Sequence, residues 1–295
     1  MKTSGSSIMW RCREREIRIG ARPLVMGILN VTPDSFSDGG RYPTIDEAVR
    51  HGIEMAAQGA DMVDVGGEST RPGADPVSAP EELARVIPVI RELARAFGSK
   101  SGAPVISVDT RKAVVAAAAL EVGAGIVNDV TALAGDSGMP AVAAQYGAGV
   151  ILMHMRGEPA TMQREPQYAD VAAEVGAYLA GRMTALLTAG LALETMAFDP
   201  GIGFGKTVEH NLELVAGVSR WAPAGRPVVL GVSRKQFIGR VTGREVADRL
   251  AGSLACAVWG ATRGAHVWRV HDVKESVEAA RMVAALNKET AAWIG

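Results

Sequence analysis

The chain has 295 residues, 48% of them apolar, which is enough for a large core and is an ordinary length for one α/β barrel. It carries 31 basic and 32 acidic residues, a net charge of -1. This balance excludes the basic field that drives non-specific nucleic-acid binding. No apolar run reaches the roughly 18 residues that are needed to span a bilayer.

Cysteine usage and the first residues indicate the compartment. Cys12 and Cys256 lie far apart, and nothing near them resembles a metal knuckle. The opening "MKTSGSS" lacks the apolar region of a signal peptide. We therefore expect a cytoplasmic protein in a reducing compartment, with neither nucleic acid nor membrane as a partner.

In chain order, residues 1–23 come first and predict a short β-hairpin that plugs the floor of a barrel. From Leu24 onward, short apolar runs alternate with Ala-rich helical stretches. The runs are mostly apolar without strict alternation, which is typical of parallel strands covered by helices. The expected strands are 24–31, 62–67, 105–110, 126–130, 150–155, 196–201, 228–233 and 266–272.

The helical stretches carry recognisable start signals. Thr44 with Glu47, and Ser78 with Glu81, have the spacing of a capping box. Eight strand-then-helix units predict a single-domain (β/α)8 TIM barrel over residues 24–295. A doubly wound sheet is the alternative, but it usually has fewer units and does not close.

Polar residues stand where nearly every expected strand ends. In a barrel of this kind the active site lies at the C-terminal mouth. One such residue is usually a helix cap, but a polar residue at almost every strand end is hard to explain by capping alone. The set is Asn30, Asp64, Asp109, Asn128, Met153 with His154, Asp199, Ser233 with Lys235, and Arg269 with His271.

These side chains separate into two chemical groups. Asp109, Asn128, Asp199 and Lys235 supply acceptors, an amide and a cation. Together they suit a flat heterocycle with N–H donors on one edge and a carbonyl on another. Arg71, Arg269 and His271 form a cationic group that, with the amide of Asn30, suits a phosphate or diphosphate.

Three further features are ambiguous. His154 is read as a satisfied strand-end histidine, because no second histidine stands at metal-ligand spacing. Asp34 and Asp38 could serve Mg²⁺ or could be plain turn residues. The stretch "GFGKT", residues 203–207, lacks P-loop spacing, and we interpret the overlapping "GIGFG", residues 201–205, as letting the backbone turn close to a ligand.

Eight motifs occur in order from about Leu24 to about Leu286, each at an expected strand end: "GILNVTPDSFSDGG", "DVGGESTRPGA", "SVDT", "NDV", "LMHMRGEP", "FDPGIGFGKTVEHN", "SRK" and "RVHDV". With these motifs the chain resembles the dihydropteroate synthases, the folate-pathway enzymes targeted by sulfonamides. The resemblance implies a cytoplasmic, homodimeric barrel. It would be a transferase that condenses 6-hydroxymethyl-7,8-dihydropterin diphosphate with 4-aminobenzoate, giving 7,8-dihydropteroate and pyrophosphate.

The resemblance also implies site residues. The pterin pocket would be Asp109, Asn128, Met153, Asp199 and Lys235. Diphosphate would meet Asn30, Arg71, Arg269 and His271, with Asn30 also a ligand of Mg²⁺. Aminobenzoate would lie against Phe36, Thr70, Pro72 and Ser233. The catalytic residues would be Asp34, Arg71 and Lys235, and residues 30–40 and 67–78 would form a lid.

Two alternatives accompany this interpretation. A corrinoid-type pterin methyltransferase shares the barrel and the pterin cradle, but it would not need Arg71, Arg269 and His271. The second alternative is a non-catalytic relative that binds a pterin or a partner. It would not need the loop residues Asn30, Asp34, Phe36, Thr70 and Arg71. The expected chemistry needs no strong general base, because an aniline nitrogen is already nucleophilic and diphosphate is a good leaving group once its charge is neutralised.

Overall fold

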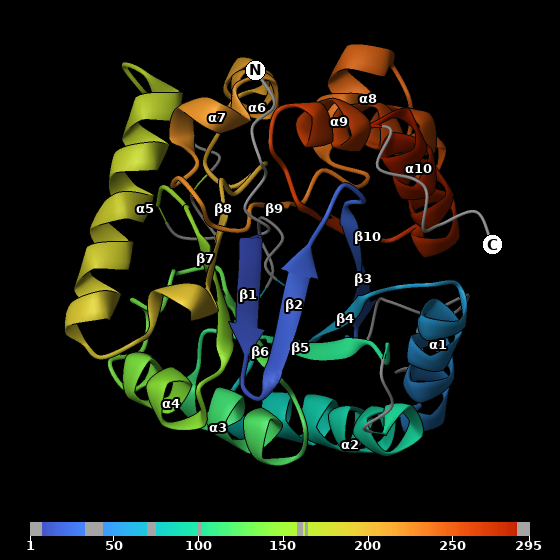
Figure 1. Cartoon of the computed structure of the whole chain (residues 1–295), viewed down its shortest axis with the longest axis vertical. Helices are drawn as coiled ribbons and strands as arrows, with labels where there is room; N and C mark the ends of the chain where they lie inside the picture. The colour runs from blue at the N-terminus through green and yellow to red at the C-terminus, as the bar shows by residue number, and fades with distance from the viewer. Residues whose placement is uncertain are drawn as a thin grey trace.

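A computed structural model describes residues 8–32, 44–69, 75–98, 102–157, 162 and 165–287. Eight parallel strands form one sheet whose order is β8-β7-β6-β5-β4-β3-β10-β9, and helices surround it (Figure 1). The bridge between Phe198 and Val228 joins the two ends of this order, so the sheet is a nearly closed barrel. The strands are β3 Leu24–Asn30, β4 Met62–Gly66, β5 Val105–Asp109, β6 Ile126–Asp129, β7 Gly149–Met153, β8 Met196–Asp199, β9 Val229–Leu230 and β10 Val267–Val270.

The predicted TIM barrel is therefore confirmed, with two differences of detail. Strand β9 spans two residues, although six were expected, because the chain turns after Leu230 and the amide of Lys235 donates to the carbonyl of Val232. The sequence patterns also left α4, α6, α7 and α8 unassigned. The helices are α1 Ile45–Ala57, α2 Ala79–Phe97, α3 Ala113–Glu121, α4 Met139–Tyr146, α5 Val171–Thr188, α6 Val208–Ala216, α7 Val218–Trp221, α8 Gln236–Thr242, α9 Leu250–Thr262 and α10 Val273–Leu286.

Helix starts follow the capping signals in part. Thr44 caps α1 and forms a full capping box, because its hydroxyl accepts from the Glu47 amide at 3.2 Å and the Glu47 carboxylate accepts from the Thr44 amide at 2.9 Å. Ser78 caps α2 through the amide of Glu81 at 3.4 Å. The Glu81 carboxylate instead pairs with Arg85 one turn later, at 2.5 Å.

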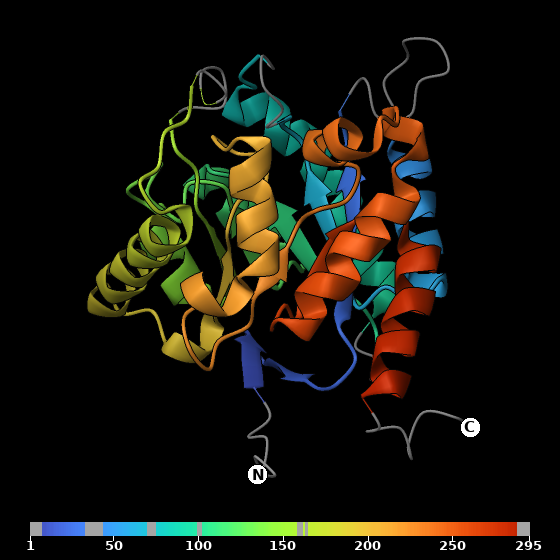
Figure 2. The ribbon, with the colours of Figure 1, turned by 90° about the horizontal axis from the view of Figure 1, so that it is seen from above.

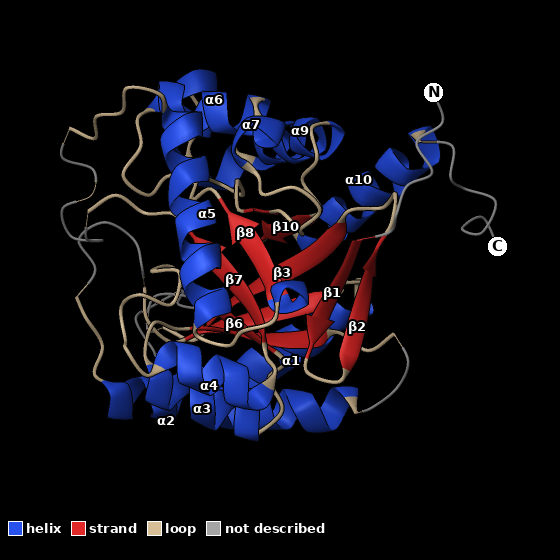
Figure 3. Cartoon of the chain, turned by 60° about the vertical axis from the view of Figure 1, so that its left-hand side comes forward, coloured by secondary structure: helices blue, strands red, loops and turns tan. Residues whose placement is uncertain are grey.

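The N-terminal hairpin consists of β1 Ile8–Cys12 and β2 Arg15–Ile19, paired antiparallel. It lies across one end of the barrel (Figures 2 and 3). Trp10 is fully buried there among apolar residues from the N-terminal ends of the strands, and its indole N–H donates to the carbonyl of Thr195 at 2.8 Å. The predicted hairpin and its role as a plug of the barrel floor are confirmed.

The register of the strands explains where the polar side chains lie. Along β4, the outward Val63 and Val65 pack in the large core beneath the helices, while Met62 packs inside the barrel against the hairpin. Because strand side chains alternate, Asp64 must also point inward, one level above Met62. Strand β10 repeats this arrangement with Val267 at the lower level and Arg269 above it. The barrel interior is thus apolar at the floor and polar at the mouth.

Among the helices of the described ranges, none is long and apolar enough to cross a membrane.

Candidate active site

A cluster of charged side chains occupies the barrel interior at the C-terminal ends of β4, β5, β6 and β10. The guanidinium of Arg269 donates from Nε to Oδ2 of Asp64 at 2.6 Å and from Nη2 to Oδ2 of Asp109 at 2.7 Å. The side-chain amide of Asn128 donates to the same oxygen of Asp64 at 2.9 Å. Asp64 is fully buried, and both donors reach its Oδ2, whereas its Oδ1 has no hydrogen-bond partner among the described residues.

Burial sets the protonation of this cluster. Removal from water raises the pKa of Asp109, the charge of Arg269 opposes this rise, and the charge of Asp64 adds to it. Burial alone would lower the pKa of Arg269, but the carboxylates of Asp64 and Asp109 raise it above its ordinary value. One cation therefore balances two carboxylates, which makes the cluster a natural acceptor of N–H donors from a ligand.

Asp199, at the end of β8, adds a third carboxylate to Asp64 and Asp109 in the barrel interior, and it is buried. Its Oδ1 accepts from the amide of Gly201 at 2.7 Å. Its Oδ2 faces the interior side of Gly231, 3.9 Å from where a Cβ there would lie. Burial raises the pKa of Asp199, and the cations of Lys235 and Arg269 partly offset that rise.

Lys235 reaches the same region from the segment after β9. Its Nζ lies 4.3 Å from the ring centroid of Phe204, a cation–π contact. The Cβ position of Gly203 is 3.5 Å from this Nζ, so the bare backbone of Gly203 leaves room for the ammonium group. Gly203 also has a φ of +82°, a conformation that favours glycine.

Ser233 and His271 lie in contact at the mouth. The Ser233 Oγ accepts from the backbone amide of His271 at 3.1 Å and lies 3.1 Å from its ring Nδ1. The sequence assigned these two residues to different ligands, aminobenzoate and diphosphate. The structure brings these two side chains into direct contact.

Asn30 ends β3, beside the glycine that ends β4. The Cβ position of Gly66 lies 3.7 Å from Oδ1 of Asn30 and 3.7 Å from Oδ2 of Asp109. No cluster of three or more His, Cys, Asp or Glu side chains within the described ranges could hold a metal ion. A single amide oxygen is nevertheless compatible with Mg²⁺, which often binds through one or two protein oxygens together with substrate phosphates and waters.

Met153 ends β7 and is buried opposite Asp199 in the strand register. The remaining predicted site residues are Asp34, Phe36, Thr70, Arg71 and Pro72. They lie outside the described residues, as do Asp38 and most of the segment 30–40. The described part of the site therefore consists of nine of the predicted residues: Asn30, Asp109, Asn128, Met153, Asp199, Ser233, Lys235, Arg269 and His271.

Several residues of the site received no role from the sequence. Asp64 stood among the polar strand ends, but nothing in its motif revealed that it shares Arg269 with Asp109. Phe204 lies in the "GFGKT" stretch, interpreted only as a turn near a ligand, and its ring contacts Lys235. Lys206 follows in the same stretch, and it is buried against His154.

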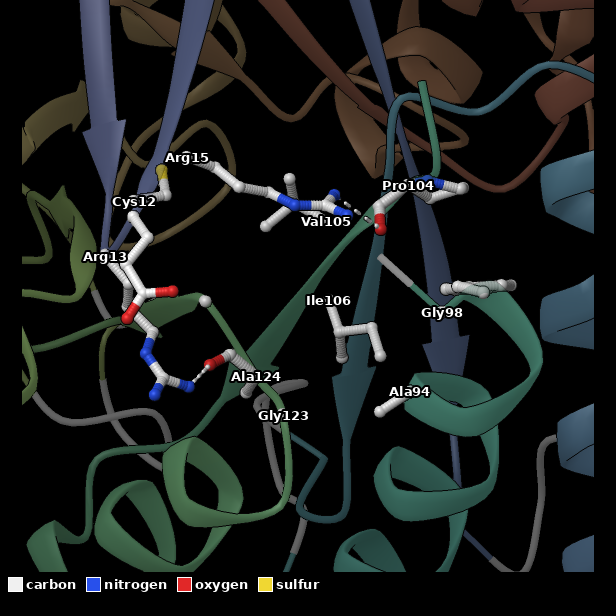
Figure 4. A pocket seen from close by; sticks show the side chains of 13 residues that line it. Cys12, Arg13, Arg15, Ala94, Gly98, Pro104, Val105, Ile106, Gly123 and Ala124 are labelled. Atoms are coloured by element: carbon white, nitrogen blue, oxygen red, sulfur yellow. Dashed lines mark hydrogen bonds between the residues drawn. The ribbon is translucent and has the colours of Figure 1, made fainter. Parts of the chain in front are cut away.

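A hollow of about 390 Å³ lies at the opposite end of the barrel, between the hairpin and the starts of β5 and β6 (Figure 4). Arg13 and Arg15 border it, and both donate to backbone carbonyls: Arg13 to that of Ala124 at 3.1 Å and Arg15 to that of Ala103 at 2.8 Å. These guanidinium groups attach the hairpin to the barrel. The polar cluster lies at the mouth, so the mouth is the candidate active site.

Comparison with known proteins identifies the family. The profile of the pterin binding enzyme family matches residues 26–271. Dihydropteroate synthase of Escherichia coli strain K12 is 49% identical over 265 residues, covering 90% of this chain and 92% of that protein.

Two solved structures are similar throughout the fold. The Xanthomonas albilineans dihydropteroate synthase with 4-aminobenzoic acid has a TM-score of 0.88 and 45% identity, covering 96% of this chain and 99% of that one. The Yersinia pestis enzyme in complex with a sulfonamide drug has a TM-score of 0.88 and 42% identity, covering 95% and 99%. The chain therefore belongs to the pterin binding enzymes and, within them, to the dihydropteroate synthases, the transferases of folate biosynthesis.

Proposed function

We propose that this protein joins 6-hydroxymethyl-7,8-dihydropterin diphosphate to 4-aminobenzoate at the barrel mouth, releasing 7,8-dihydropteroate and pyrophosphate. The observation that carries the assignment of the site is the set of buried, inward-pointing carboxylates at strand ends, each held by a donor from the protein. The high identity to enzymes of this name supports the reaction.

The pterin would lie between the two carboxylate groups of the interior. Asp199 would accept ring N–H donors with its inward oxygen, while Lys235 would donate to a ring acceptor beside it. Asp109 and Asn128 would contact the opposite edge, and Met153 would cover a ring face. A rigid arrangement of this kind orients the methylene carbon of the substrate toward the mouth.

The diphosphate would meet Asn30, Arg71, Arg269 and His271 above the pterin. Arg269 supports both subsites, because its guanidinium is held by two carboxylates of the interior and lies near the mouth. Mg²⁺, held by Asn30 and the phosphate oxygens, would supply charge neutralisation for the leaving group. Asp34 would face the reacting carbon.

Aminobenzoate would lie against Phe36, Thr70 and Pro72, with its carboxylate at Ser233. Its amine nitrogen forms the new C–N bond as the C–O bond to diphosphate breaks, and the surplus proton of the nitrogen passes to water. No general base is needed for an aniline, so positioning and electrostatic stabilisation would supply the rate. The identity to named dihydropteroate synthases favours this reaction over the corrinoid-type methyl transfer.

We further propose that the protein is homodimeric and cytoplasmic. The support for the second point is that both cysteines are free, with Cys12 buried and its pKa raised by burial. The support for the first is the resemblance to the family. Analytical ultracentrifugation would test the dimer directly.

The test of the reaction is pyrophosphate release. Release should require both substrates and Mg²⁺ together, and each substrate alone should give none. Lys235→Met should lower the rate, because the pterin loses its cationic partner. Asp61→Asn, at the floor, should leave the rate nearly unchanged. Equal pyrophosphate release without aminobenzoate would show a diphosphatase and overturn the proposal.

A further inference from the structure

Lys206 is a buried lysine beside the site that the proposed chemistry does not use. Its side chain lies between the ends of β7 and β8, and only 3% of the residue is exposed. Its Nζ lies 3.0 Å from Nδ1 of His154, 3.4 Å from the carbonyl of His154 and 2.9 Å from the carbonyl of Phe204. Within the described ranges, no carboxylate is hydrogen-bonded to it.

The segment that contains Lys206, residues 200–206, is folded tightly against residues 154–156. A Cβ at Gly201 would collide with the carbonyl oxygen of His154, and one at Gly205 would collide with that of Arg156. Both glycines have positive φ, at +69° and +63°. Tyr168, which lies outside this segment, also holds it, since its hydroxyl donates to the carbonyl of Gly205 at 2.9 Å. Lys206, which lies within the segment, joins it to residue 154 through its hydrogen bonds to the carbonyls of His154 and Phe204.

This segment carries the groups that shape the pterin pocket. It begins directly after Asp199, whose carboxylate accepts from the amide of Gly201. Five residues after Asp199, the Phe204 ring contacts the ammonium group of Lys235. Because Lys206 holds the carbonyl of Phe204 itself, a shift of Lys206 would move that ring and the lysine above it.

The protonated side chain of Lys206 has as many N–H donors as there are hydrogen-bond acceptors around it. An ammonium group has three N–H donors, and three acceptors surround it. Burial, with the charges of Lys206 and Arg156, lowers the pKa of His154 to about 3, so its ring is neutral and Nδ1 can accept. Burial also lowers the pKa of Lys206 to about 7, while the charge of Asp199 opposes that effect.

We propose that Lys206 is a positioning residue, whose ammonium group locks residues 200–206 onto the end of β7 and so holds Phe204 and Lys235 in their pterin-binding geometry. The proposal rests on the proposed function for the pterin pocket. It gives the lysine of "GFGKT" a role inside the protein, with no direct contact to phosphate.

The first test compares Lys206→Met with Arg226→Met. Arg226 is a matched control, because it is also a buried cation that donates to backbone carbonyls, those of Glu194 and Met196, but at the floor end of β8. Both variants should lose stability. Binding of 6-hydroxymethylpterin, measured by calorimetry near pH 6, should weaken at least about tenfold in Lys206→Met only.

A Lys206→Met protein that binds the pterin as tightly as the wild type would overturn the proposal, whatever its stability. Equal weakening in Arg226→Met would do the same, because the effect would then be general destabilisation. A wild-type protein that does not bind this pterin would overturn the proposed function and, with it, the inference. The two failures are therefore distinguishable.

A second pair of variants, at His154, tests the same proposal if Lys206→Met does not fold. His154→Asn retains an acceptor oxygen near the position of Nδ1, whereas His154→Leu removes it, and both lose the edge-on ring contact with Tyr178. The Leu variant should bind the pterin at least about threefold more weakly than the Asn variant, since one acceptor of the ammonium is lost. Equal affinities in the two variants would contradict the proposal.

Discussion

Asp199→Asn gives the sharpest test of the pterin pocket, because the structure specifies how the new side chain must lie. The amide of Gly201 donates to Oδ1 of Asp199 at 2.7 Å. In the Asn variant, the side-chain oxygen must stay at this position, since the NH₂ group cannot accept. The NH₂ group is therefore forced into the place of Oδ2, the oxygen that faces the barrel interior.

The expected loss follows from this geometry. A hydrogen bond to a charged group contributes about 1.5–3 kcal/mol, and the variant replaces the acceptor with a donor that faces the ring N–H. Affinity for the pterin should therefore fall by about 10- to 150-fold. Lys235 would also lose its nearby negative charge, which adds to the loss. The fold should tolerate the change, because the neutral amide is less costly to bury than a carboxylate.

The assay is calorimetric titration with a pterin, with Asp61→Asn as the control. Asp61 makes comparable bonds, from Arg22 at 2.5 Å and from the amide of Val25 at 2.8 Å, but at the floor of the barrel. The control should bind the pterin with wild-type affinity. A folded Asp199→Asn protein that also does so would remove Asp199 from the pocket and refute the reasoning.

Three further results are expected. A sulfonamide should compete with aminobenzoate for the wall that includes Ser233, and non-competitive kinetics would contradict that wall. Trp10→Ala should lower the free energy of unfolding by about 3–5 kcal/mol, since it empties the floor plug, yet leave pterin affinity unchanged. Burial lowers the pKa of His154 from 6.5 to about 3, so the stability it contributes is full above pH 6.5 and is lost as pH falls toward 3. Between about pH 7 and pH 5, the free energy of unfolding, measured with urea, should therefore fall by about 2 kcal/mol more in the wild type than in His154→Asn. An equal fall in the two proteins would show that His154 does not titrate in this way.

The sequence alone was sufficient for the order of the strands, for six of the ten helices within the described ranges and for the polar character of the strand ends. Apolar runs and capping residues are local signals, because strand formation and helix starts depend on neighbours in the chain. Thr44 illustrates this, since its full capping box forms as its spacing predicts. Ser78 shows the limit, because Glu81 has a competing partner in Arg85, four residues further on.

Only the tertiary structure decided which polar residues meet. Arg269 lies 205 residues from Asp64 and 160 from Asp109, and no local pattern relates them. They meet because the last strand, β10, pairs with the first strand of the barrel, β3, which in turn pairs with β4, and β4 with β5. In the same way, the pairing of β8 with β7 brings Lys206, a residue of a glycine-rich turn, against His154 at the end of β7. Residue types and strand periodicity are local properties of the sequence. Ion pairing and burial depend on contacts between distant segments, which exist only once the strands have assembled into the barrel.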